Sequence, residues 1–194
     1  MNILITYFSQ TGNTKKVATT ILECLLKEGH SIDLKRIQDT ELSADSEYDV
    51  IFIGSACHSS DLAQPVKQFL HTLEVPNSCV VVGFVTHATV EPTGEWANKC
   101  LNTYIKECYL KNITFKGYFS CLGKPSPAIE EFIHSSVIPD KSHFQAYLKL
   151  VRNHPDKNDL RHAKLFAKEV IASLDSDGVI ILFKKYLFSR DPVP

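Results

Sequence analysis

Three stretches of the chain are almost continuously apolar and rich in β-branched side chains, as in strands buried on both faces of a parallel sheet. They cover residues 2–8, 49–55 and 79–86. Residues 113–121 form a further predicted strand, and residues 31–37 alternate apolar and polar positions, as in an edge strand with one face in water. The pattern therefore predicts five strands.

The segments between these strands carry apolar residues at the spacing of amphipathic helices. After the first strand, Val17, Ile21 and Leu25 recur every fourth residue, and Gly29 stands where a left-handed residue would end the helix. The remaining predicted helices begin at Pro65, span residues 97–108, occupy two short stretches within residues 122–155, and follow Asp156, whose carboxylate suits an N-cap.

The alternation of strands and helices with short connections predicts an α/β fold with an open parallel sheet and right-handed crossovers. A ligand of such a sheet binds beyond the carboxyl ends of the strands, near the point where the strand order reverses. The loops that follow the strands are therefore the expected place for a site.

The loop after the first strand, Ser9-Gln10-Thr11-Gly12-Asn13-Thr14, has the composition of a phosphate-binding site. The first backbone N–H groups of the next helix have no acceptor within that helix, and the helix dipole favours an anion beside them. Three hydroxyl side chains in the loop add donors. Lys15 and Lys16 either attract the same anion or extend into solvent. The loop matches neither the Walker P-loop nor the GxGxxG dinucleotide loop.

The stretch Tyr7-Phe8-Ser9-Gln10-Thr11-Gly12-Asn13-Thr14, with Ala18 and Ile21 after it, resembles the FMN-phosphate loop of the flavodoxin family. Its chief departure is Thr6, where the family prefers an apolar residue. The resemblance covers residues 1–174 and implies a doubly wound, five-stranded parallel sheet of strand order 2-1-3-4-5 in a three-layer α/β/α arrangement. It separates a flavodoxin-like FMN-binding domain, residues 1–174, from a C-terminal tail, residues 175–194.

The resemblance also implies the cofactor and the residues that hold it. In flavodoxins the first loop binds the FMN phosphate, and the loops after the third and fourth strands flank the isoalloxazine ring. The cofactor-binding residues implied for this chain are Ser9, Gln10, Thr11, Gly12, Asn13, Thr14, Ser55, Ala56, Cys57, His58, Thr86, His87 and Ala88.

Two departures from the flavodoxin pattern concern the flavin ring. Neither flanking loop has a Phe, Tyr or Trp where flavodoxins commonly stack an aromatic ring, so His58 and His87 are the rings on offer. No glycine stands between Ala56 and Leu62, where flavodoxins tend to flip a peptide toward the reduced flavin, and a non-glycine residue adopts positive φ at a cost. We expect weak stabilisation of the one-electron-reduced flavin and a flavin face that other molecules can approach.

Two side chains of the second loop are candidates for chemistry. His58 is a weak catalytic candidate, a proton donor beside the flavin, because imidazole titrates near neutral pH; otherwise it is a polar loop residue. Cys57 is either a redox thiol or, as we favour, a small filler, because no second cysteine lies close to it in the sequence.

Composition narrows the class of protein further. A chain of 194 residues with a net charge of −1 fits one globular domain, and it lacks both the basic surface that nucleic acid requires and a strongly acidic docking surface. The six cysteines show no CxxC and no metal-ligand spacing, which argues against an iron–sulfur cluster or other metal and favours a reduced, cytoplasmic protein. We expect no signal peptide and no membrane span, since the chain starts on a strand and its apolar runs are short.

The tail from Gly178 to Pro194 is apolar enough to need a cover. We expect it to pack on its own domain. A homodimer contact through the tail is the second interpretation, and a membrane surface is the third.

The sequence favours an FMN-binding, flavodoxin-like electron-transfer protein that works with redox partner proteins or a small redox substrate. Two alternatives stay open. One is an enzyme, an FMN-dependent NAD(P)H:quinone-type reductase, which the longer segment 122–155 and the uncovered flavin would suit, although no second nucleotide-binding loop is visible. The other is a flavin-free phosphate-binding or interaction module.

Overall fold

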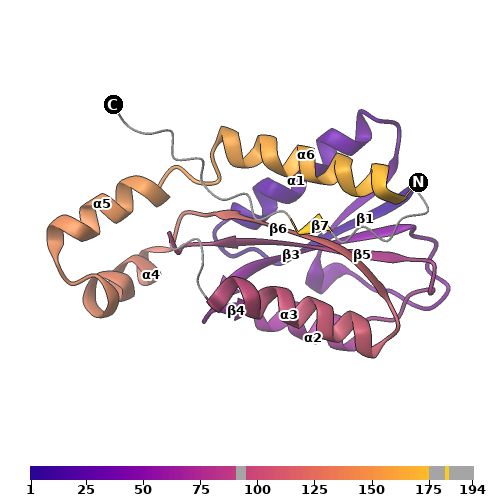
Figure 1. Ribbon diagram of the computed structural model, residues 1–194, viewed down its shortest axis with the longest axis horizontal. Helices are drawn as coiled ribbons and strands as arrows, with labels where there is room; N and C mark the ends of the chain where they lie inside the picture. Colours follow the sequence, from indigo (N-terminus) through magenta and orange to yellow (C-terminus); the bar gives the residue numbers. More distant parts are fainter. Residues whose placement is uncertain (91–94, 175–181, 184–194) are drawn as a thin grey trace.

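A parallel sheet runs through the middle of the protein, with helices on both of its faces (Figure 1). The computed structural model describes residues 1–90, 95–174 and 182–183. The strands lie in the order β2-β1-β3-β5-β6-β7, and a short β4 pairs with β3 in the antiparallel direction. Their bounds are β1 Asn2–Tyr7, β2 Ser31–Arg36, β3 Val50–His58, β4 Asp61–Leu62, β5 Val80–His87, β6 Thr114–Leu122 and β7 Leu182–Phe183.

The five long strands confirm the predicted fold and the predicted order 2-1-3-4-5, because β5 and β6 are the fourth and fifth of them. Two short strands were not predicted. The hairpin strand β4 lies in what the sequence suggested was a loop, and β7 comes from the C-terminal tail. In β7, Leu182 and Phe183 pair with Gly117 and Tyr118 of β6, so this part of the tail packs on its own domain. The rest of the tail lies outside the described residues.

Two hydrophobic clusters, one on each face of the sheet, hold the layers together. Helices α1, Asn13–Leu26, and α6, Lys157–Leu174, cover one face. Helices α2, Gln64–Thr72, and α3, Glu95–Leu110, cover the other. Neighbouring residues of one strand serve opposite faces: Ile3 and Ile5 of β1 contribute to the first cluster and Leu4 to the second.

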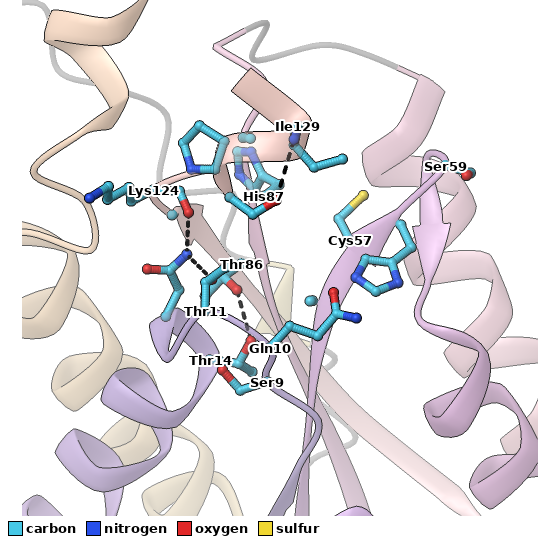
Figure 2. A pocket seen from close by; sticks show the side chains of 17 residues that line it. Ser9, Gln10, Thr11, Thr14, Cys57, Ser59, Thr86, His87, Lys124 and Ile129 are labelled. Atoms are coloured by element: carbon cyan, nitrogen blue, oxygen red, sulfur yellow. Dashed lines mark hydrogen bonds between the residues drawn. The ribbon is translucent and has the colours of Figure 1, made fainter. Parts of the chain in front are cut away.

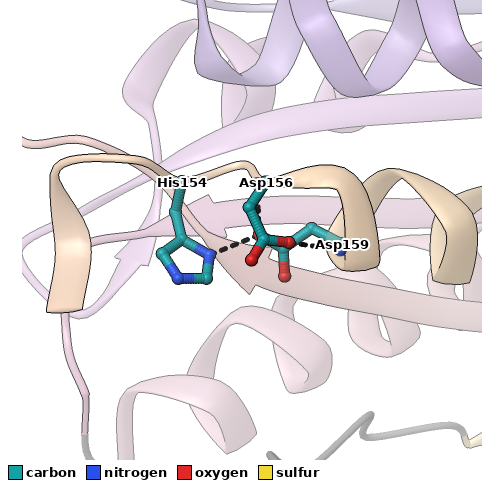
Figure 3. Close-up of side chains that lie close together, drawn as sticks. All are labelled: His154, Asp156 and Asp159. Atoms are coloured by element: carbon teal, nitrogen blue, oxygen red, sulfur yellow. Dashed lines mark hydrogen bonds and ion pairs between the residues drawn. The ribbon is translucent and has the colours of Figure 1, made fainter.

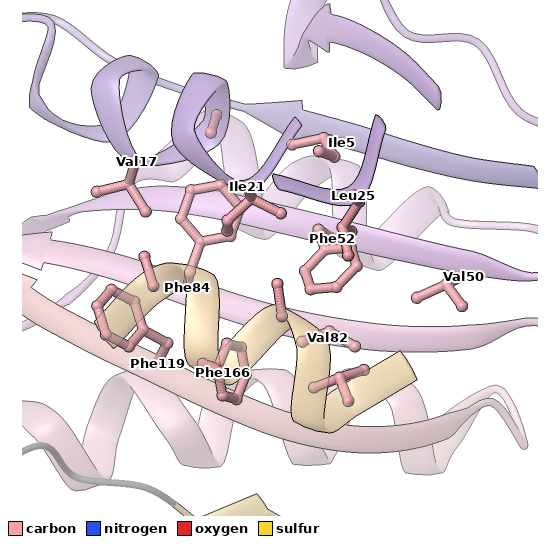
Figure 4. Packing of buried hydrophobic residues seen from close by; sticks show 14 of the residues in the cluster. Ile5, Val17, Ile21, Leu25, Val50, Phe52, Val82, Phe84, Phe119 and Phe166 are labelled. Carbon is pink, nitrogen blue, oxygen red and sulfur yellow. The ribbon is translucent and has the colours of Figure 1, made fainter. Parts of the chain in front are cut away.

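The cluster under α1 and α6 confirms the helical face read from the sequence (Figure 4). Val17, Ile21 and Leu25 are fully buried against the sheet. Phe119 of β6 stacks on Phe166 of α6, with ring centroids 5.8 Å apart and planes at 28°. Buried aromatic pairs of this kind stabilise a core beyond the area that they bury.

Local signals set the helix ends as predicted. Gly29 has a φ of 85° after α1, and the Asp156 carboxylate accepts hydrogen bonds from the N–H groups of Asn158 and Asp159 at 2.7 and 2.9 Å. The two short helices predicted within residues 122–155 are also present. They are α4, Pro127–Phe132, which continues into the π-helix η2, Ile133–Val137, and α5, Lys141–Val151; a 3-10 turn η1, Ile37–Asp39, follows β2.

A polar cluster at the start of α6 joins the end of segment 122–155 to that helix (Figure 3). His154 Nδ1 is hydrogen-bonded to Asp159 Oδ2, and the same carboxylate oxygen accepts the Asp156 N–H at 2.8 Å. His154, Asp156 and Asp159 are close enough to share a metal ion, but their carboxylates already serve as caps for α6. The cluster is therefore accounted for as a helix N-terminus.

We expect the His154 contact to make stability depend on pH. The hydrogen bond to Asp159 raises the pKa of His154 above its ordinary 6.5. The contact therefore stabilises the fold fully below pH 6.5 and loses its effect as the pH rises through the folded-state pKa. His154→Gln should lower the free energy of unfolding more just below pH 6.5 than at alkaline pH, measured by urea denaturation. His143→Gln, on an exposed ring, controls for the loss of a histidine, and an equal loss at both pH values would contradict the assignment.

A second prediction concerns the face of the sheet that α2 and α3 cover. The fully buried Tyr104 of α3 donates its hydroxyl to the Ile53 carbonyl of β3 at 2.9 Å. Tyr104→Phe removes a buried donor and should lower the free energy of unfolding by about 1–2 kcal/mol. Tyr109→Phe, on the same helix but 80% exposed, is the matched control and should have almost no effect. Equal effects of the two changes would mean that the hydrogen bond contributes nothing.

Candidate cofactor-binding cleft

A cleft of about 330 Å³ opens at the carboxyl ends of β1, β3 and β5, where the strand order reverses (Figure 2). Three loops that are far apart in sequence form its walls, together with the segment that follows β6. The lining residues are Ser9, Gln10, Thr11, Asn13, Thr14, Ala56, Cys57, His58, Ser59, Thr86, His87, Ala88, Gly123, Lys124, Pro125, Ser126 and Ile129.

The first loop presents the N-terminus of α1 to this cleft. Gly12 is the N-cap in a left-handed conformation, with a φ of 88°, and its N–H donates to Ser9 Oγ at 3.1 Å. The Lys16 N–H donates to the Gly12 carbonyl at 2.9 Å and is the first bond of the helix. The N–H groups of residues 13–15 precede that bond and have no acceptor within the helix. Free amides and the positive end of the dipole favour an anion here.

Side-chain hydrogen bonds connect the first loop to the other walls. Thr14 Oγ1 lies 2.9 Å from Thr86 Oγ1 in a buried contact, which joins the first loop to the end of β5. Asn13 Nδ2 donates to Thr11 Oγ1 at 2.9 Å and to the Lys124 carbonyl at 2.7 Å. Gly123 permits this approach, because a Cβ there would lie 2.8 Å from Asn13 Nδ2. These contacts tie the first loop to β5 and to the segment after β6.

Lys15 and Lys16 are both exposed, as the second interpretation of the sequence expected. The Lys16 ammonium donates to the Pro155 carbonyl at 2.6 Å, so it holds the start of α6 rather than facing an anion. Lys124 also belongs to the lining, where its backbone carbonyl accepts the Asn13 hydrogen bond, and sequence reasoning missed it as a site residue; its place two residues after β6, at the carboxyl edge of the sheet, was the available signal.

The lining contains every cofactor-binding residue implied by the sequence except Gly12 and Ser55. Gly12 forms the turn into α1 with its positive φ angle. Ser55 is fully buried, and its hydroxyl accepts the Ala63 N–H at 2.9 Å and donates to the Ala56 carbonyl at 2.8 Å, so it supports the turn into α2. The lining residues that were not anticipated are Ser59, Gly123, Lys124, Pro125, Ser126 and Ile129.

The second wall of the cleft ends in a tight hairpin. His58 of β3 pairs with Asp61 of β4, and the two residues between them, Ser59 and Ser60, have φ angles of 49° and 63°. Two successive positive φ angles are the requirement of a type I′ turn, which Asn-Gly usually satisfies. The chain therefore adopts positive φ at this edge without glycine. Asp61 ties the hairpin to α3, because Thr103 Oγ1 donates to its carboxylate at 2.9 Å.

The rings near the cleft are the two predicted histidines. His58 packs edge-to-face on Phe8, with centroids 5.9 Å apart and planes at 86°, and burial lowers its pKa below the usual 6.5, so the ring is neutral at pH 7. His87 Nδ1 lies 3.0 Å from the Thr89 carbonyl. Among the described residues that line the cleft, none is Phe, Tyr or Trp.

The charge of the cleft suits an anionic ligand. Among its described lining residues none carries a carboxylate. Hydroxyl donors and free helix amides on a wall without acids form a donor set that suits a phosphate monoester. The volume is also in the range of small-molecule sites.

The fold and the position of the cleft are those of the flavodoxin class, and comparison with known proteins agrees. The profile of the Flavodoxin domain family matches residues 4–168, and the chain belongs to this family. Membership implies a flavin-binding protein of the electron-transfer and oxidoreductase type.

One characterised relative and several solved structures are similar over nearly their whole length. The chain is 27% identical over 178 residues to the flavodoxin-like domain-containing protein BilS of Clostridioides difficile, covering 88% of this chain and 97% of that protein. Oxidised flavodoxin 1 of Bacillus cereus superimposes with a TM-score of 0.60 at 13% identity, covering 89% of this chain and 98% of that one. A short-chain flavodoxin associated with a bacterial microcompartment gives a TM-score of 0.62 at 11% identity, with 90% and 99% covered. These structural likenesses show the fold.

None of the helices in the described part of the chain is both long and apolar enough to cross a membrane.

The serine turn yields a prediction about stability. A Cβ in the left-handed region costs about 1–2 kcal/mol, and glycine avoids this at a smaller entropic cost. Ser60→Gly should therefore raise the free energy of unfolding by up to about 1 kcal/mol. Ser60→Ala keeps the Cβ and serves as the control, with no gain expected. Thermal and urea denaturation would measure both, and equal behaviour of the two variants would show that the turn is unstrained.

Proposed function

We propose that this chain binds FMN in the cleft and transfers electrons between redox partner proteins, or to a small redox substrate. The observation that carries the proposal is the first loop. It joins free helix amides and hydroxyl side chains on a wall without carboxylates, at the strand-order reversal of a flavodoxin fold.

The residues present fit FMN in two parts. The FMN phosphate would be held by the hydroxyls of Ser9 and Thr11 and by the amides of residues 13–15. The flavin ring would lie beside residues 56–58 and 86–88. FMN supplies the redox chemistry when it is bound, and the protein binds, orients and shields it.

The protein contributes a preformed site and a neutral imidazole. The Thr14–Thr86 and Asn13–Lys124 contacts fix the loops before the cofactor binds, which lowers the ordering cost of binding. His58 is neutral at pH 7, so one ring nitrogen can donate a hydrogen bond while the other accepts one, and its lowered pKa makes the ring a poor proton donor at this pH. No bulky aromatic side chain covers the described lining, which leaves room for a second redox group to approach.

The compartment and partners are part of this proposal. We place the protein in the cytoplasm, which the six free cysteines support, since disulfides are rare there. Contact with redox partners would occur at the rim of the cleft, where one-electron carriers exchange electrons. Homodimer formation through the tail stays a prediction.

Removing the hydroxyls of the first loop tests the phosphate assignment. The double variant Ser9→Ala/Thr11→Ala should bind FMN about ten-fold or more weakly, because it loses hydrogen bonds to a charged group. Its affinity for riboflavin, which lacks the phosphate, should stay unchanged. Titration of flavin fluorescence measures both, and Ser43→Ala/Thr72→Ala removes two exposed hydroxyls elsewhere as the matched control.

The outcomes separate the competing functions. Unchanged FMN affinity in Ser9→Ala/Thr11→Ala would show that the loop is not the phosphate site. Wild-type protein that binds inorganic phosphate but no flavin would be the flavin-free module. Reduction of the bound flavin by NADPH in a single turnover, without a partner protein, would favour the NAD(P)H reductase over an electron carrier.

A further inference from the structure

Two cysteines that are 43 residues apart in sequence meet at the wall of the cleft. Cys57, near the end of β3, lines the cleft and is half-buried (Figure 2). Cys100 of α3 is fully buried behind it, and the two sulfur atoms are 3.9 Å apart. One thiol is thus open to small molecules in the cleft, and the other lies directly behind it.

The two thiols have different chemical characters. The Cys100 S–H donates to Cys57 Sγ, and this contact, with help from the Ser60 backbone N–H, lowers the pKa of Cys57. The same contact and burial raise the pKa of Cys100. A thiolate is the nucleophile in thiol–disulfide exchange, so Cys57 is suited to attack and Cys100 to react second.

We propose that Cys57 and Cys100 form a redox-active dithiol pair that reduces low-molecular-weight disulfides entering the cleft. The Cys57 thiolate attacks one sulfur of the disulfide RSSR, forms a mixed disulfide and releases the first RS⁻, which takes up a proton. Cys100 then loses its proton, attacks Cys57 Sγ and expels the second RS⁻. Two protein thiols are oxidised to one disulfide, and RSSR is reduced to two RSH.

The surrounding structure permits the second step. A disulfide needs the sulfurs to close from 3.9 Å to about 2.05 Å. The Asp61–Thr103 hydrogen bond already holds the hairpin after Cys57 against α3, one turn beyond Cys100. The strand end that carries Cys57 and the helix that carries Cys100 are thus already joined beside the two sulfur atoms.

The four other cysteines should compete little with this pair for disulfides. Cys24, Cys79, Cys108 and Cys121 are buried, and burial raises the pKa of each thiol. They should react slowly with any disulfide in solution. The proposal concerns the thiols of the protein without bound cofactor, since FMN would lie beside Cys57, and it does not require that the cleft binds FMN.

Mass spectrometry of the full chain after exposure to oxidised glutathione tests the pair. Wild-type protein should lose two hydrogens, retain no glutathione, and yield a disulfide-linked peptide pair containing Cys57 and Cys100. Cys100→Ser should instead keep one glutathione on Cys57, and Cys57→Ser should react about ten-fold or more slowly. Cys108→Ser, which removes a buried thiol from the same helix, should behave as wild type.

Stable glutathione on Cys57 of the wild-type protein, with Cys100 still free after denaturation, would overturn the proposal. So would a Cys57 that reacts no faster than the four buried cysteines. The wild-type peptide map decides the matter even if a variant fails to fold. Because the readout is mass rather than flavin, failure here is separate from failure of FMN binding.

Discussion

Parallel hydrogen bonding between β1 and its two neighbours is the constraint on which the rest of the structure depends. Strands that run in one direction must return through helices, and the sheet is therefore covered on both faces. All the strand-to-helix turns then fall along the same edge. The cleft needs no further organising feature, since the turns after β1, β3 and β5 meet where the order of strands reverses.

Within that edge, polar contacts between distant segments determine the shape of the site. The hydroxyls of Thr14 and Thr86 share a buried hydrogen bond, and the Asn13 amide bridges to the segment after β6. An unpaired polar group in such a place costs far more than a paired one gains, so these contacts hold the loops in one arrangement. When a ligand binds to a site of this kind, the entropic cost of ordering the loops is small.

Sequence reasoning succeeded where the signal is local. The apolar face of α1, the glycine after it and the Asp156 cap each depend on residues within a few positions of one another, and each was found where expected. The strand order followed from the family resemblance, and the structure has it. Local patterns of this type report backbone preference and periodicity, which act within a turn or two.

Sequence reasoning failed where a contact joins distant segments of the chain or where a residue adopts an uncommon backbone conformation. Cys57 looked unaccompanied because its neighbour Cys100 is distant in the chain, and a lone sequence gives no sign of that contact. Lys16 is exposed, as one interpretation expected, but the sequence gives no sign that its ammonium donates to the carbonyl of the distant Pro155. The hairpin turn at Ser59 and Ser60 was not predicted, because turns with two positive φ angles usually contain glycine or asparagine and this one contains neither.

The two-residue strand β7 affects whether the edge of the sheet can pair with another chain. An open sheet ends in strands whose outward N–H and C=O groups are free to pair with another chain. At Gly117 and Tyr118 those groups of β6 face Leu182 and Phe183 of the same chain instead. Residues 182–183 of the tail thus cover part of the sheet edge through which association with another sheet would begin.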